Sequence, residues 1–352
     1  MEKIVYLLGA GASRGTRGPK QINSSYELLK PDWVSKCSFS YADIQSGLPV
    51  VNEIPGRLSF LISRLADEKK ELEKQRNINN DLEELINDIE WIRDNSERHA
   101  SIDTFAKKLY LTKNEEDYFR LKKALIVYLT FEQYNKPDGR YDSFFASILG
   151  KDKDDLPQNI TLLSWNYDCQ VEMAYEEYLR SDDIASTAYY LNEYNKIAEL
   201  FDESPYDKID GFKIIKLNGT ALIGNGNYLS KDKKYQIVQS LIDLYKEIKP
   251  EKIRLSFAWE RMGNRFQTLI SDSIADADVL VIIGYSFPFF NREVDRLIFN
   301  SMPNLKKIYI QDPNAEKIKI GLKSVLEEGT YAFHHIEMLE PDGKQFFLPP
   351  EL

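Results

Sequence analysis

Cysteine and histidine are scarce in this chain of 352 residues, which contains only two cysteines and three histidines. Two cysteines cannot form a zinc module of four cysteine ligands, and they argue against a framework of disulfide bonds. His99 lies far along the chain from the adjacent pair His334 and His335, so a histidine-rich metal site is not expected either. The sequence therefore predicts a protein that works without a bound metal.

Excess positive charge and long apolar runs are also missing. The chain has 46 Lys and Arg against 56 Asp and Glu, which argues against non-specific nucleic-acid binding and gives no reason to expect direct sequence-specific binding. No stretch approaches the ~20 apolar residues of a membrane-spanning helix. The apolar run 4–8 is shorter than the core of a signal peptide, so we expect a strand that runs into a glycine turn. These features predict a cytoplasmic protein without a membrane segment.

Short apolar runs alternate with helical patterns along much of the chain. Because strands that alternate with helices form parallel sheets covered on both faces, we predict an α/β, Rossmann-like fold. The expected strands are residues 3–8, 161–165, 212–217, 278–283 and 307–310. The expected helices in the same part of the fold are residues 265–274, 293–299 and 315–326.

Residues 57–150 differ from the rest, because they carry long charged and apolar patterns with few strand signals. We expect a large helical insertion there, with patterns over 58–94 and 115–134, and with polar caps at residues 101–104. Charged runs such as 67–74 are expected to be solvated helix faces. A second helical excursion is expected over 231–264. The Rossmann-like core is then built from 1–56, 151–230 and 265–335.

Two glycines follow the first expected strand, in the motif Gly9-Ala10-Gly11-Ala12-Ser13. Glycine allows a tight turn and close approach to a pyrophosphate, although a strand-ending turn without a ligand explains the same pattern. The third glycine of the dinucleotide-binding fingerprint is missing, which argues against an ordinary dehydrogenase.

Polar residues follow the other expected strands in the same way. Asn166 and Asp168 come after the second strand, and Asp168 can alternatively cap a helix that begins near Cys169. The further strand ends carry Asn218 with Gly219, then Gly284-Tyr285-Ser286, and then Asp312. Because ligands of open α/β sheets bind at the carboxyl ends of the strands, these residues together predict a binding site.

The order and spacing of these five motifs resemble the sirtuin-like fold family, whose members bind NAD. The resemblance implies that Asn166, Asp168 and Asn218 form the catalytic part, beside the nicotinamide ribose. It also implies a cofactor-binding part that contacts the phosphates, the ribose and the adenosine of NAD, namely Gly9, Ala10, Gly11, Ser13, Gly219, Gly284, Tyr285, Ser286 and Asp312.

Two departures from the family refine this interpretation. Cys37 and Cys169 cannot build the zinc ribbon of the deacylating sirtuins, so the chain looks more like bacterial sirtuin-like proteins of anti-phage defence. Those proteins hydrolyse NAD, and some act beside HerA-type ATPases. Residues 48–55 and 101–105 also look like that branch. The second departure is Asn218, which stands where the family has its catalytic histidine; asparagine can bond a ribose hydroxyl but cannot take its proton.

Three functions follow as hypotheses. The first is an NAD glycohydrolase that depletes NAD in anti-phage defence and is activated by assembly with a partner. The second is a non-catalytic subunit that binds NAD or ADP-ribose and regulates an ATPase or nuclease. The third is an unrelated doubly wound enzyme such as a dehydrogenase. Because helical insertions of this length commonly form subunit contacts, we also expect a homo-oligomer.

Overall fold

The computed structural model describes residues 2–13, 54–74, 80–99, 101–135, 138–152, 155–180, 184–196, 211–221, 237–339 and 345–352. The expectations for Cys37, for residues 48–53 and for the start of the second excursion at 231–236 lie outside these residues. The described chain divides into two compact units. The sheet unit contains residues 1–13, 139–220 and 254–352, and the helical unit contains residues 14–138 and 221–253.

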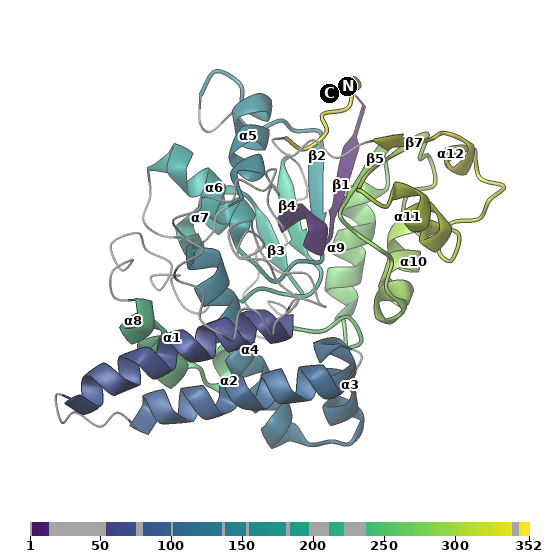
Figure 1. The fold of residues 1–352 in the computed structure, drawn as a ribbon. Coiled ribbons are helices and arrows are strands. Elements are labelled where there is room, and N and C mark those ends of the chain that lie inside the picture. The colour runs from purple at the N-terminus through teal and green to yellow at the C-terminus, as the bar shows by residue number, and fades with distance from the viewer. Residues whose placement is uncertain are drawn as a thin grey trace, which may run out of the picture. The chain divides into compact units, whose positions relative to one another are not determined.

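The sheet unit is built on a seven-stranded sheet with the strand order β3-β4-β2-β1-β5-β6-β7. Its strands are β1 (Ile4–Leu8), β2 (Ile160–Ser164), β3 (Glu193–Asn195), β4 (Lys213–Lys216), β5 (Val279–Ile283), β6 (Lys307–Gln311) and β7 (Ile336–Leu339). All six neighbouring pairs run parallel. β1 lies between β2 and β5 at the centre (Figure 1). The predicted α/β, Rossmann-like fold is therefore confirmed.

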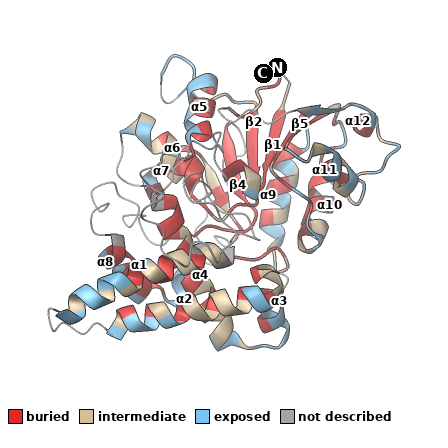
Figure 2. Ribbon diagram, viewed as in Figure 1, coloured by how far each residue is buried: buried red, intermediate tan, exposed pale blue. Residues whose placement is uncertain are grey.

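Helices cover both faces of this sheet, because alternate side chains of each strand enter two separate cores. Val5 and Leu7 of β1 belong to the core that contains residues of α9 (Asn264–Ile274), α10 (Arg292–Asn300) and α11 (Ala315–Leu322). Ile4, Tyr6 and Leu8 belong to the core with α5 (Gly139–Ile148) and α6 (Gln170–Leu179). Every residue of β1 is buried, as expected of a central parallel strand (Figure 2).

Smaller elements complete the sheet unit. They are η1 (Ala10–Ser13), α7 (Ile184–Tyr190), η8 (Phe289–Asn291) and α12 (Tyr331–His334). The predicted helix over 315–326 ends as α11 at Leu322. The strands β3 and β7 were not expected from the sequence. β3 has three residues and β7 is only half-buried at its two ends and exposed between them, so neither shows a strong apolar run.

The helical unit contains five α-helices within its described residues. They are α1 (Ile54–Lys74), α2 (Asn80–Arg98), α3 (Ile102–Leu111), α4 (Glu115–Asn135) and α8 (Ile237–Glu247). The 3-10 helix η7 (Pro250–Lys252) follows α8. The pattern read over 58–94 is therefore two helices. Ser101 caps α3 as predicted, since its side chain accepts a hydrogen bond from the backbone N–H of Thr104 at 3.1 Å.

Asp88 of α2 joins three helices of this unit. Its carboxylate accepts a hydrogen bond from Arg120 of α4 at 2.5 Å and one from the hydroxyl of Tyr245 in α8 at 2.6 Å. In the sequence, α8 follows β4, whereas α2 and α4 precede β2. The contacts of Asp88 explain why α8 nevertheless packs with α2 and α4. No helix in the described ranges is both long and apolar enough to cross a membrane.

The boundaries of the insertion differ from those expected. The sequence interpretation extended the insertion to residue 150, whereas α5 belongs to the sheet unit, because Tyr141, Phe144 and Phe145 pack in the core of the sheet. The second excursion ends earlier than residue 264, since the chain returns to the sheet unit at Arg254 and Leu255 bridges Gly219.

Candidate functional site at the carboxyl edge of the sheet

The predicted motifs all lie at one edge of the sheet. The last paired residues of five strands stand side by side in register: Leu8, Ser164, Lys216, Ile283 and Gln311. Gly9, Gly284 and Asp312 come one residue later, and Asn166 and Asn218 come two residues later. Because the strands are parallel, these positions share the carboxyl edge, where ligands of open α/β sheets bind.

The glycines after β1 and β5 pack against each other. Gly11 donates its N–H to the carbonyl of Gly284 at 3.0 Å, and a Cβ added to Gly9 would lie 2.5 Å from the same carbonyl oxygen. Gly284 itself has φ +60°, which disfavours any other residue. The N–H groups of Gly9 and Ala12 are also bonded, to the carbonyls of Ile283 and Gly9. These three N–H groups are therefore not available to a phosphate in this conformation. Their hydrogen bonds are those of a turn that ends the strand.

Asn166 joins the loops after β2 and β1. Its side-chain amide donates to the carbonyl of Gly9 at 2.9 Å and to the hydroxyl of Ser13 at 3.0 Å. Ser13 also shares a hydrogen bond of 2.9 Å with the hydroxyl of Tyr141. Arg140 donates to the carbonyls of Gly11 and Ala12, at 3.1 Å each. The structure thus brings Asn166 and Ser13 together in a buried polar chain.

Asp168 lies one residue before Cys169, the N-cap residue of α6, and its side chain bonds to the start of that helix. Its carboxylate accepts a hydrogen bond from the N–H of Gln170, the first residue of α6, at 3.1 Å. Burial raises the pKa of Asp168, while Lys216, the Gln170 N–H and the Ser13 hydroxyl lower it less than burial raises it. Asp168 is therefore a better proton acceptor than an ordinary carboxylate.

Asn218 has one bonded and one unbonded end. Its side-chain nitrogen donates to the carbonyl of Trp165 at 3.1 Å. Asn218 is only 6% exposed, and its buried Oδ1 atom has no hydrogen-bond partner among the described residues. An unpaired buried oxygen is costly, so a hydrogen-bond donor that reached Oδ1 of Asn218 would be stabilising. Gly219 follows with φ +70°, and a Cβ there would clash with the carbonyl of Arg254.

Tyr285 was expected to contact the cofactor, but the structure places it in the core. Its hydroxyl donates to the carboxylate of Asp295 in α10, at 2.8 Å to each oxygen, and its ring stacks on Trp165. Burial raises the pKa of Asp295 to about 7, against the hydrogen bond from Tyr285. The hydroxyl of Tyr285 thus bonds a buried side chain of the same unit and does not point to a ligand.

The remaining predicted positions are accessible. Ala10 and Ser286 are exposed, and Asp312 is half-buried. The carboxylate of Asp312 accepts a hydrogen bond from the N–H of Asn314 at 2.7 Å, and burial raises its pKa. The edge therefore has a buried part around Asn166 and Asn218 and an open part around Ala10, Ser286 and Asp312.

Three residues of this site were not anticipated from the sequence: Arg140, Tyr141 and Lys216. The only signal for Lys216 is a lysine at the carboxyl end of a short strand whose two central residues are apolar. Arg140 and Tyr141 lie at the start of α5, whose aromatic residues pack on the sheet, whereas the sequence pattern places this segment in the insertion.

The histidines do not belong to this edge. His99 lies in the helical unit, where its ring packs on Phe105. His335 follows α12, where Tyr331 stacks on its ring at 4.0 Å. Among the described residues, no group of three or more His, Cys, Asp or Glu side chains could hold a metal ion.

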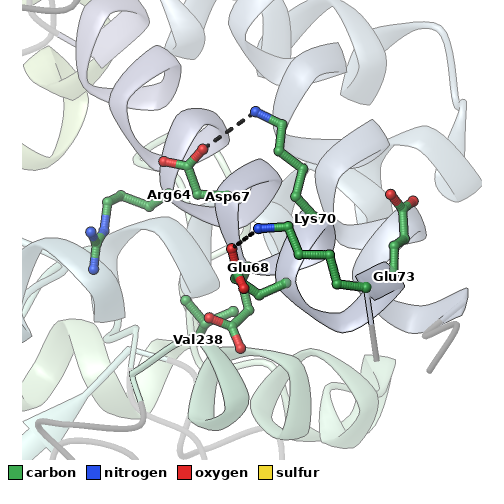
Figure 3. Close-up of a pocket in the computed structure, with 8 residues that line it drawn as sticks. Arg64, Asp67, Glu68, Lys70, Glu73 and Val238 are labelled. Carbon is green, nitrogen blue, oxygen red and sulfur yellow. Dashed lines mark hydrogen bonds and ion pairs between the residues drawn. The ribbon is translucent and has the colours of Figure 1, made fainter. Parts of the chain in front are cut away.

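A hollow of about 660 Å³ lies in the helical unit, between α1 and α8 (Figure 3). Its walls are charged side chains of both signs from residues 64–74, with Val238 opposite. Lys70 pairs with Asp67, and Lys74 with Glu71, on the same helix. The charged run 67–74 is therefore the solvated helix face that the sequence predicts.

No protein-family model matches the chain, and no curated protein matches it at a significant level. The assignment to the sirtuin-like family stays a prediction from the motifs.

Proposed function

We propose that the carboxyl edge of the sheet binds NAD and hydrolyses the bond between nicotinamide and ribose. The observation that carries this proposal is the buried Oδ1 atom of Asn218, which has no hydrogen-bond partner among the described residues. Asn218 lies at the same carboxyl edge of the sheet as Asn166. A ribose hydroxyl is a donor that satisfies such an atom. The accessible residues Ala10, Ser286 and Asp312 would face the phosphates and adenosine.

The residues present suit a dissociative cleavage. Water attacks the anomeric carbon of the ribose as the carbon–nitrogen bond breaks, and nicotinamide leaves with the bonding electrons as a neutral molecule. The transition state resembles an oxocarbenium ion, which buried polar groups stabilise. Asn218 accepts from a ribose hydroxyl, and Asp168, whose pKa is raised by burial, takes the proton of the attacking water.

A second candidate is binding of NAD or ADP-ribose without cleavage. Two observations favour it. Asparagine at position 218 cannot act as a base, and the carboxylate of Asp168 already accepts hydrogen bonds from Gln170 and Ser13. In this case the chain is the regulatory subunit of an ATPase or nuclease complex.

Product analysis distinguishes the two candidates. The full chain is incubated with NAD for hours at micromolar concentration, with and without a HerA-type ATPase, and nicotinamide and ADP-ribose are quantified. Hydrolysis predicts both products in equal amounts and none with Asn166→Ala. Intact NAD under both conditions contradicts hydrolysis, and binding of ADP-ribose without turnover then supports the second candidate.

The biological setting belongs to the same proposal. NAD depletion in anti-phage defence and activation by assembly rest on the motif resemblance, a homo-oligomeric state on the length of the helical insertion, and a cytoplasmic location on the absence of long apolar runs. Light scattering after size-exclusion chromatography tests the oligomer, and a monomer at working concentration contradicts it.

A further inference from the structure

Lys216 is a fully buried lysine directly behind the candidate site. It is the last residue of β4, two residues before Asn218, and it is 0% exposed. Its ammonium group forms an ion pair with Glu172 of α6 at 2.7 Å. The same ammonium group donates a hydrogen bond to the backbone carbonyl of Asp168 at 2.6 Å. A buried charge is retained only where it is paired and hydrogen-bonded, and both conditions are met here.

Acidic groups from two elements hold this charge in place. Burial opposes the ionised form of Glu172, but the nearby ammonium group of Lys216 and the neighbouring Glu193 of β3 act in the opposite direction, and the pKa of Glu172 is lowered. The pKa of Glu193 is raised well above its usual range by burial and by the nearby Glu172. The protonated form of Glu193 is therefore favoured, while Glu172 is ionised opposite Lys216.

The contacts of Lys216 lead to Asn166 in a short sequence of steps. Lys216 donates to the carbonyl of Asp168, and the carboxylate of Asp168 accepts a hydrogen bond from the N–H of Gln170, the first residue of α6. The hydroxyl of Ser13 hydrogen-bonds the carboxylate of Asp168 and also accepts the amide of Asn166. The loop from Asn166 to Asp168 is thus fixed on one side by Ser13 and on the other by Lys216.

We propose that Lys216, with Glu172 as its counter-ion, is the positioning residue of the Asn166–Asp168 loop and holds it in the conformation that binds the ligand. This inference rests on the proposed function for its ligand. The positioning itself is a property of the free protein.

The test compares two buried lysines of one strand. Lys216→Met removes the ammonium group at the carboxyl end of β4, and Lys213→Met removes a buried lysine at its amino end. Hydrogen exchange followed by mass spectrometry monitors peptides that span residues 165–172 and, as an internal reference, residues 3–8. ADP-ribose affinity is measured by calorimetry on the same variants.

The expected result for Lys216→Met is exchange at least tenfold faster in residues 165–172, unchanged exchange in residues 3–8, and at least tenfold weaker ADP-ribose binding. Lys213→Met should leave both the loop and the affinity as in the wild type. If Lys216→Met does not fold, the double variant Lys216→Met/Glu172→Gln removes the uncompensated buried charge while still lacking the bond to Asp168.

A folded variant without the ammonium group whose loop exchanges at the wild-type rate overturns the inference. Equal acceleration in both peptides overturns it as well, because it shows a general loss of stability. Absence of ADP-ribose binding in the wild type contradicts the proposed function instead, and the exchange data then decide the positioning role alone.

Discussion

The side-chain amide of Asn166 donates a hydrogen bond to the backbone carbonyl of Gly9 at 2.9 Å, and so joins the loops that follow β2 and β1. Asn159 forms the corresponding contact at the other edge of the same strand pair, where its amide donates to the carbonyl of Glu2 at 2.8 Å. One type of interaction therefore closes the two central strands at both ends. Only the contact at the carboxyl edge adjoins the candidate site.

Comparing Asn166→Ala with Asn159→Ala separates the effect on stability from the effect on ligand binding. Asn166→Ala leaves the hydroxyl of Ser13 and the carbonyl of Gly9 with one partner fewer, so unfolding in urea should show a loss of about 1–3 kcal/mol. ADP-ribose binding should be lost as well. Asn159→Ala is the matched control and should lower stability while leaving the affinity unchanged. Equal effects of both variants on affinity would count against the assigned edge.

The contact between the loops after β1 and β5 depends on Gly284. Gly284→Ala forces a Cβ into the backbone of Gly11 at a positive φ, so we expect destabilisation by more than about 2 kcal/mol in urea unfolding. Gly139→Ala serves as the control, because a Cβ there meets no atom within 4 Å. A Gly284→Ala protein as stable as the wild type would show that the two loops can separate.

Asp295 makes stability depend on pH in an unusual direction. The folded protein keeps this proton up to about pH 7, whereas the unfolded chain releases it near pH 4, so folding takes up a proton between these values. The contribution of Asp295 to stability therefore falls as the pH rises through this range. Asp295→Asn removes this contribution.

Urea unfolding of both proteins at several pH values checks this prediction. The stability of Asp295→Asn relative to the wild type should rise with pH, by at most about 1.4 kcal/mol per pH unit between pH 4 and 7. Parallel stability curves for the two proteins would mean that Asp295 titrates normally in the folded state.

Asn218→His introduces a base at the position that, by the motif resemblance, matches the catalytic histidine of the sirtuin-like proteins. The Nδ1 atom of histidine can replace the amide nitrogen that donates to Trp165, which leaves Nε2 for a ribose hydroxyl. NAD hydrolysis should increase by ~10²–10⁴-fold, the usual contribution of a general base. Asn218→Gln, which adds no base, is the control and should not increase the rate. No gain with histidine would indicate that the rest of the site is not competent for cleavage.

The sequence predicts the central part of the fold well and its periphery poorly. β1 and β5 are continuous apolar runs, as expected of buried parallel strands. β3 has three residues, and β7 is nowhere fully buried, so neither has a pattern that separates it from a loop. The charged and apolar pattern over 58–94 predicts helical structure, but it does not show the boundary between α1 and α2.

The candidate site was located by its position, but the roles of its residues were not all predictable. A glycine pattern indicates that another group approaches the backbone closely. It does not show whether this group is a phosphate or the backbone of another loop, as it is between Gly11 and Gly284. The roles of Tyr285 and Lys216 depend on Asp295 and Glu172, which lie on helices packed against the sheet. Such tertiary pairings cannot be read from spacing along the chain.

Calorimetric titration of the full chain with NAD and with ADP-ribose tests the central claim most directly. The account predicts saturable binding of one ligand per chain, which disappears in Asn166→Ala and persists in Asn159→Ala. Absence of binding heat for both ligands at millimolar concentration, or binding that survives in Asn166→Ala, would contradict an NAD site at the carboxyl edge of the sheet.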